Sequence, residues 1–254
     1  MHIEIDGRSA TVERLSAAAP VGYGHFTAMQ VRNGRVRGLG LHLARLDAAN
    51  REMFGASLDT AAVRGYIGHA LSGQDHDASV RVYVYEAPGG PAVMVTVRPP
   101  GTMAPDVWRL QTVPYQRSLA HIKHLGDFGQ SYFGRQAHRN GFDEALLTGA
   151  AGVISEGSIT NIGFFNGDEL VWPDAPALRG ITMQILERTL PGHGVSSRHG
   201  PVHTADLRSF TAAFVTNSHG IAPVAEIDDV ILPVDDSLTR ILIEAYESAG
   251  WDHI

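Results

Sequence analysis

Two kinds of hydrophobic pattern alternate along the first hundred residues. Apolar residues at every second position predict strands over residues 3–5, 28–31, 80–85 and 92–97. Hairpin turns are expected where turn residues punctuate these strands, at Asp6-Gly7, Asn33-Gly34 and Pro88-Gly89-Gly90-Pro91. Apolar residues spaced by three or four predict helices over residues 42–54 and 60–71, the second capped by Asp59.

The pattern becomes richer in strands beyond Pro99-Pro100-Gly101. Strands are predicted over residues 107–113, 144–147, 153–154, 162–165, 170–172 and 212–215, and helices over residues 130–139, 182–190 and 237–249. Residues 114–120 are interpreted as a connecting loop. We therefore predict an α/β (α+β) chain with a small N-terminal α+β domain over residues 1–113 and a larger, strand-rich domain over residues 121–254.

Composition narrows the class of protein. The chain is 44% hydrophobic and 19% charged, which is typical of a globular protein, and its formal net charge is -7. The absence of a basic run argues against a nucleic-acid partner, and no apolar stretch is long enough to span a membrane. We predict no signal peptide, no metal site and, with no cysteine, no disulfide or thiolate chemistry, so the cytoplasm is the expected compartment.

Almost all of the basic residues are arginine rather than lysine. Lysine and arginine total 20, and Lys123 is the only lysine among them. Arginine replaces lysine on many surfaces, but its guanidinium does not deprotonate in proteins and cannot supply a neutral amine. A Schiff base requires such an amine. Lys123 is therefore either a remaining surface lysine or the amine of a catalytic Schiff base.

Other segments carry the groups that pyridoxal 5'-phosphate (PLP) requires, namely an acid for the ring nitrogen and a cradle for the phosphate. Glu156 ends a predicted strand, and Arg45 lies on the helix predicted over residues 42–54. Gly180-Ile181-Thr182 opens a helix, and Thr216-Asn217-Ser218-His219-Gly220 follows a buried strand. Each segment also has a plain structural interpretation, as a turn acid, a solvated helix charge, an ordinary helix start or a loop.

The order and spacing of these segments resemble the class IV aminotransferases, which are the fold type IV PLP enzymes. The resemblance covers about residues 23–224. It rests on the blocks Tyr23-Gly24-His25-Phe26-Thr27, His42-Leu43-Ala44-Arg45-Leu46, Asp143-Glu144-Ala145-Leu146-Leu147, Glu156-Gly157-Ser158 and Leu178-Arg179-Gly180-Ile181-Thr182, with Pro223-Val224 closing the last loop. The family includes branched-chain aminotransferase, D-amino-acid aminotransferase and 4-amino-4-deoxychorismate lyase.

The resemblance implies a role for each matching residue. Lys123 would form the Schiff base and move the proton, and Glu156 would pair with the pyridine nitrogen. The residues implied to hold the phosphate end of the cofactor are Arg45, Gly180, Ile181, Thr182, Asn217 and Ser218. The resemblance also implies a homodimer of two-domain subunits, with small-molecule amine or amino acid and keto acid substrates.

Two departures from the family pattern concern the cofactor ring and the substrate. Phe128 stands where many members place a tyrosine five residues after the lysine, so Tyr132 or a water would have to take over its contact. The turn over residues 86–91 contains no arginine, although several members use one there for a substrate carboxylate. The candidates for substrate contact are therefore His25, Thr27 and Arg98.

The resemblance leaves the reaction open. An aminotransferase is favoured, and 4-amino-4-deoxychorismate lyase, which releases pyruvate and 4-aminobenzoate, is the alternative. The lyase substrate has two carboxylates, and burying an unpaired charge is costly. A third interpretation is a non-catalytic binding protein that retains the fold, against which stands the presence of the only lysine at the Schiff-base position.

Overall fold

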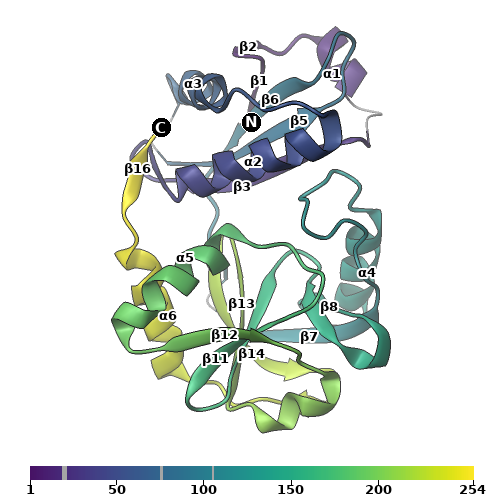
Figure 1. Cartoon of the computed structure of the whole chain (residues 1–254), viewed down its shortest axis with the longest axis vertical. Helices are drawn as coiled ribbons and strands as arrows, with labels where there is room; N and C mark the ends of the chain where they lie inside the picture. The colour runs from purple at the N-terminus through teal and green to yellow at the C-terminus, as the bar shows by residue number, and fades with distance from the viewer. Residues whose placement is uncertain (19–21, 75–76, 105) are drawn as a thin grey trace. The chain divides into compact units, whose positions relative to one another are not determined.

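The computed structural model describes residues 1–18, 22–74, 77–104 and 106–254, which fall into two compact units (Figure 1). Unit 1 consists of Met1–Gly101, Ile122–Gly126 and Gly250–Ile254, and unit 2 of Thr102–His121 and Asp127–Ala249. These units differ from the sequence-based boundaries at three places, one of which is the C-terminal segment Gly250–Ile254 in unit 1. The strand predicted over residues 107–113 lies in unit 2, because it pairs there, and the segment with Lys123 lies in unit 1.

Unit 1 is built on an antiparallel sheet. Its described residues form five strands in the order β2-β1-β6-β5-β3. These strands are β1 (His2–Ile5), β2 (Arg8–Ser9), β3 (Gly24–Val31), β5 (Ala78–Tyr85) and β6 (Ala92–Arg98). The helices of the unit are α1 (Val12–Ala18), α2 (Leu39–Phe54) and α3 (Thr60–Leu71), and a separate strand pair joins β4 (Arg35–Arg37) to β16 (Trp251–His253).

The core of unit 1 lies between the sheet and helices α2 and α3. Alternate valines of β5 and β6 pack with Leu46 of α2 and Ile67 of α3, so one face of the sheet is covered by these helices (Figure 1). The predicted local signals are confirmed. Asp59 accepts a hydrogen bond from the Ala62 N–H at 2.9 Å, and the Asn33-Gly34 turn has left-handed φ angles of 51° and 68°.

Unit 2 is built on a mixed, curved sheet. Its described residues form nine strands, eight of them in the order β12-β11-β10-β13-β14-β7-β8-β9, with β15 paired to β14. The strands are β7 (Trp108–Pro114), β8 (Glu144–Thr148), β9 (Ile154–Gly157), β10 (Asn161–Phe165), β11 (Glu169–Pro173), β12 (Ser196–Gly200), β13 (Ala212–Asn217), β14 (Gly220–Ile227) and β15 (Val230–Ile231). Because β9 also contacts β10, the sheet curls into a half-barrel.

Helices cover the outside of this half-barrel. Helix α4 (Phe128–Arg139) packs on β7 and β8, while α5 (Ile181–Thr189) and α6 (Asp236–Ser248) pack together against β13 and β14. Short 3₁₀ helices occupy Ala150–Gly152, Leu190–His193 and Thr204–Ser209. Among the described residues, no helix is long and apolar enough to cross a membrane.

The hydrophobic pattern of the sequence does not predict some strands of unit 2. Strand β14 contains Pro223, which has no N–H to donate and argues against a strand inside a sheet. The structure accommodates Pro223 because β7 pairs with β14 only from Val224 onward. Strand β12 reads Ser-Ser-Arg-His-Gly and lies at the sheet edge, where a polar strand needs only one partner.

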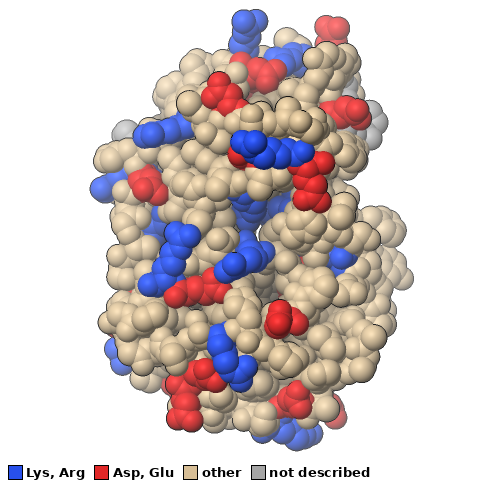
Figure 2. Space-filling model, viewed as in Figure 1, with Lys and Arg blue, Asp and Glu red and all other residues tan. Residues whose placement is uncertain are grey.

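Charge is spread evenly over the surface that can be seen. On the face of the molecule in Figure 2, basic side chains are interspersed with acidic ones. The ion pairs of the described residues include Arg109 with Glu226 at 2.7 Å and Arg198 with Glu169 at 2.6 Å.

Candidate functional site

Lys123 lies in an extended segment at the β3 edge of unit 1. The Phe26 N–H donates to the Lys123 carbonyl at 2.8 Å, and the Leu125 N–H donates to the Gly24 carbonyl at 2.9 Å. A side chain at Gly24 would place its Cβ 2.5 Å from the Val84 carbonyl oxygen, so the close approach of these backbones requires glycine. The Lys123 Nζ lies 4.8 Å from the centre of the Phe26 ring. The two backbone hydrogen bonds therefore fix the segment over residues 123–125 against β3.

Arg45 is a cation with no acidic partner among the described residues. Its Nη2 donates to the Thr27 hydroxyl, and its buried Nε has no hydrogen-bond partner among the described residues. No ion pair joins Arg45 to a described acid, and burial lowers its pKa to about 10, which still leaves it charged at neutral pH. Such a group favours an anion, because a desolvated charge is costly until it is paired.

Two neutral histidines accompany Arg45 in unit 1. The His42 Nδ1 lies 2.7 Å from the Thr27 Oγ1, and burial, followed by the charge of Arg45, holds the pKa of His42 well below its usual range. Because Arg45 can only donate to Thr27, the Thr27 hydroxyl is free to donate to His42, which is then protonated at Nε2. Burial also lowers the pKa of His25 to about 4, with Asn50 acting in the opposite direction.

Glu156 lies on β9 in unit 2 and is only 4% exposed. Its Oε1 accepts from the Arg117 Nη1 at 2.9 Å, and its Oε2 accepts from the Leu178 N–H at 3.0 Å. Arg117 is buried too and also donates to the Ala120 carbonyl at 3.0 Å. A buried carboxylate needs such partners to offset the cost of removing its charge from water.

The first turn of α5 meets the end of β13. The Thr182 hydroxyl donates to the Asn217 carbonyl at 2.7 Å, and the Asn217 Oδ1 accepts from the His219 N–H at 2.8 Å. Gly180 caps the helix, and Ser218 follows Asn217 in a turn. The N–H groups of a first helical turn lack partners within the helix and favour an anion. The structure therefore brings together the predicted phosphate-binding residues of unit 2.

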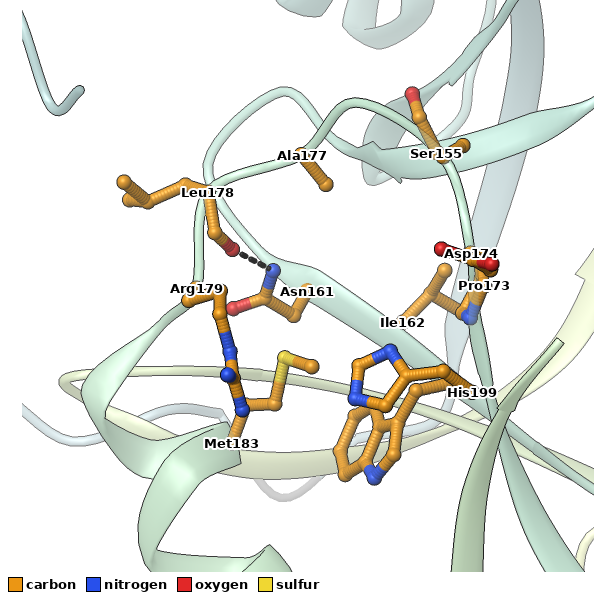
Figure 3. Close-up of a pocket in the computed structure, with 12 residues that line it drawn as sticks. Ser155, Asn161, Ile162, Pro173, Asp174, Ala177, Leu178, Arg179, Met183 and His199 are labelled. Atoms are coloured by element: carbon orange, nitrogen blue, oxygen red, sulfur yellow. Dashed lines mark hydrogen bonds between the residues drawn. The ribbon is translucent and has the colours of Figure 1, made fainter. Parts of the chain in front are cut away.

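A cavity of about 260 Å³ lies behind the loop that leads into α5 (Figure 3). Asn161 and Leu178 line it, and the Asn161 Nδ2 donates to the Leu178 carbonyl at 2.7 Å. Ser155 lines the cavity as well, whereas its neighbour Glu156 does not. Since adjacent residues of a strand point to opposite faces, this cavity lies on the face of β9 opposite to the Glu156 carboxylate.

The other predicted residues lie on β3, β6 and α4. His25 and Thr27 are buried on β3, and Arg98 is exposed at the end of β6. Phe128 and Tyr132 lie one turn apart on α4, with ring centres 6.2 Å apart. The roles proposed for these residues stay predictions.

Sequence reasoning missed several residues that touch the predicted ones. Arg117 belongs to a segment predicted as a loop, and no pattern in that loop indicates a buried ion pair. Leu178 occurs in a block of the family resemblance, but its contacts with Glu156 and Asn161 depend on the fold. His42 precedes Arg45 by one helical turn, and this spacing is the signal that would have connected them.

Comparison with known families identifies the chain. A family model described as Amino-transferase class IV matches residues 24–227. The chain belongs to the class IV aminotransferase family. This match spans both units and includes Arg45, Lys123 and Glu156. No curated protein sequence matches the chain.

Similar solved structures show the fold of this member of the family. The TM-score is 0.81 with a hypothetical aminotransferase from Mycobacterium tuberculosis in its PLP-bound form, at 22% identity over 91% of this chain and 89% of the other. It is 0.83 with the branched-chain aminotransferase of Thermoproteus uzoniensis, at 22% identity over 97% and 93%. It is 0.80 with a protein assigned as 4-amino-4-deoxychorismate lyase from Legionella pneumophila, at 20% identity over 89% and 91%. The predicted fold class is confirmed.

PLP is the cofactor of this family, and the predicted cofactor is confirmed. The residues of each unit fit its chemistry. Unit 1 offers a lysine and a buried cation without an acid, which suit an aldehyde and a phosphate. Unit 2 offers a buried carboxylate and a helix N-terminus, which suit a protonated ring nitrogen and an anionic group.

Proposed function

We propose that this class IV aminotransferase moves an amino group between an amine or amino acid and a keto acid, with Lys123 as the Schiff-base lysine. The observation that carries the proposal is that the only lysine of the chain lies in a segment whose backbone is fixed to β3. No arginine can replace its amine, because a guanidinium stays protonated. The same amine would move the proton at the substrate carbon.

Different residues would hold different parts of the cofactor. Bound PLP supplies an electron sink for the reaction. Glu156, oriented by Arg117 and the Leu178 N–H, would pair with the ring nitrogen and favour its protonated form. Arg45, the N-terminus of α5 and the Asn217 loop would hold the phosphate through charge and N–H groups.

Aminotransferase chemistry is favoured over lyase chemistry by the charge of one turn. The connection between β5 and β6 carries Glu86 and two prolines but no base. A lyase acting on a substrate with two carboxylates would need a cation for each of them, because an unpaired buried charge is costly. The turn therefore suits an amine donor that carries one carboxylate or none. The similarity in fold to a protein assigned as 4-amino-4-deoxychorismate lyase keeps that reaction as the alternative.

The two reactions leave the cofactor in different forms. A donor given alone to an aminotransferase converts the cofactor once to its amine form, whereas a lyase regenerates the starting form and continues. The test follows the visible spectrum of the purified enzyme with a panel of amines and, separately, with 4-amino-4-deoxychorismate. Conversion of the cofactor by an amine supports the proposal. Steady release of 4-aminobenzoate, with no amine changing the spectrum, contradicts it.

We further propose that the chain forms a homodimer. Phe128 is 81% exposed and Tyr132 is 54% exposed, and their rings stack on the outer side of α4. Exposed aromatic groups of this kind are typical of surfaces that bind another protein. Light scattering should give twice the mass of the 27.3 kDa chain, and a monomer at micromolar concentration would contradict this proposal.

A further inference from the structure

Glu144 is a buried acid of unit 2 with no role in the proposed reaction. It lies on β8 and is 2% exposed. Its Oε1 accepts from the Ile159 N–H at 2.5 Å and from the Ser158 hydroxyl at 3.2 Å, and its Oε2 accepts from the Thr160 hydroxyl at 2.8 Å. A Cβ at Gly157 would lie 2.6 Å from the same Oε1, so glycine is needed for the carboxylate to approach. The Glu144 carboxylate therefore accepts a hydrogen bond from every residue of the loop over residues 158–160.

This loop joins the two residues that hold Leu178. Glu156 precedes it on β9 and accepts from the Leu178 N–H, while Asn161 follows it on β10 and donates to the Leu178 carbonyl (Figure 3). The spacing of Glu156 and Asn161 thus depends on the conformation of the loop. Asn161 also bears on the start of α5, because a Cβ at Gly180 would lie 2.0 Å from the Asn161 Oδ1.

We propose that Glu144 is a positioning residue, whose ionised carboxylate holds the loop over residues 158–160 and thereby fixes Glu156 and Asn161 on Leu178. The consequence for catalysis rests on the proposed function, because the placement of Glu156 matters only if its carboxylate meets the cofactor ring. The loop contacts themselves do not depend on that function. Glu144 contacts neither substrate nor cofactor in this role and acts through the backbone that it holds.

The role depends on the ionised form of Glu144. Every group directed at it is a donor, and a carboxylate that gains a proton loses acceptor capacity for one of them. Burial raises the pKa of Glu144 to about 7, although the hydrogen bonds from the loop act in the opposite direction. Ionisation of Glu144 thus lowers the free energy of unfolding of the protein, although the ionised carboxylate orders the loop. The loop should loosen as the pH falls through about 7.

Neighbouring charges do not provide an alternative source for this titration. The charged or titratable side chains on the elements packed against β8 are Arg109 on β7, Tyr132, Arg135, His138 and Arg139 on α4, and Glu156 on β9. The four on α4 are exposed, Arg109 makes two hydrogen bonds to Glu226, and Glu156 is paired with Arg117. The adjacent Asp143 accepts from the Arg109 N–H at 2.7 Å.

The test measures amide exchange of Ile159, whose N–H is bound directly to Glu144. Residue-resolved hydrogen exchange is recorded between about pH 6 and 8, corrected for intrinsic exchange, on protein without added PLP. We expect wild-type protection to fall about tenfold or more as the pH decreases through about 7, the effect of losing a hydrogen bond to a charged group. Glu144→Gln should exchange rapidly at every pH, whereas Glu226→Gln, which removes a partly buried acid paired with Arg109, should behave as wild type.

Two results would overturn the role of Glu144. One is a wild-type Ile159 amide with no inflection in this range, a measurement that needs no variant to fold. The other is a Glu144→Gln protein that protects Ile159 as well as wild type does. These outcomes are independent of the reaction, since no cofactor is present. If exchange behaves as expected but Glu156→Gln reacts as fast as wild type with an amine donor, the proposed catalytic role of Glu156 fails and the loop role of Glu144 stands.

Discussion

Replacing Arg45 should raise the stability of the fold but weaken the binding of the cofactor. The Arg45 guanidinium is half-buried on α2 with the Thr27 hydroxyl as its hydrogen-bond acceptor and with no acidic partner among the described residues. Methionine keeps much of the aliphatic stem of Arg45 but removes the charge. Thr27 would not be left unpaired, because its hydroxyl can still donate to the His42 Nδ1.

The magnitude follows from the burial of the charge. The pKa of Arg45 is lowered from its usual value to about 10, which corresponds to about 3 kcal/mol against the charged form at about 1.4 kcal/mol per pKa unit. Because the side chain is only half-buried, solvent screening reduces this figure to about 1–2 kcal/mol. Arg45→Met should therefore stabilise the protein without cofactor by about that amount. It should also weaken PLP binding by about 10- to 150-fold, the effect of losing a charge-assisted phosphate contact.

Two measurements on the same preparation test both effects. Urea unfolding of the cofactor-free protein gives the free energy of unfolding, and titration with PLP gives the dissociation constant. Arg51→Met is the matched control, because Arg51 lies on the same helix but is exposed and paired with Asp47. It should leave PLP affinity unchanged. A less stable Arg45→Met protein with wild-type PLP affinity would refute the reasoning and make Arg45 a structural residue.

Three further predictions concern the other buried or reactive groups. Lys123→Ala should abolish turnover with any amine donor, because no other lysine exists; turnover within tenfold of wild type would contradict this. Glu156→Gln should retain PLP but slow the donor half-reaction in stopped-flow spectra, since a neutral amide favours the protonated ring nitrogen less; an unchanged rate would leave Glu156 a structural acid. The pKa of Glu144 is raised from 4.5 to about 7, so the folded state binds its proton more readily than the unfolded state does. The contribution of Glu144 is thus fully present below about pH 4.5 and is lost as the pH rises through about 7, a loss of about 3 kcal/mol. Glu144→Gln should remove that slope from the pH dependence of the unfolding free energy, and an unchanged slope would assign it to another group.

Local signals carried most of the fold prediction. Alternation and turn residues indicated β5, β6 and the turn at Asn33-Gly34, because these depend on neighbours in sequence. Strand β14 was missed because the effect of Pro223 depends on where β7 begins to pair, which no local window contains.

Some residues of the site could be predicted from local sequence, whereas others depend on the fold. Lys123 and Glu156 could be predicted because their residue types match the chemistry of PLP and the order of the family blocks. Arg117 could not, since its partner Glu156 is 39 residues away in sequence. The contacts of Glu144 and Asn161 likewise join residues 14 to 17 positions apart across loops, and only the folded chain shows them.

The most direct test of the central claim is reductive trapping. Borohydride treatment of the purified enzyme with bound PLP, followed by digestion and mass spectrometry, reports which residue carries the cofactor. We predict a single modified peptide, with the phosphopyridoxyl group on Lys123. An enzyme that turns over amines but yields no adduct at Lys123, or an adduct that persists in Lys123→Ala, would contradict the account.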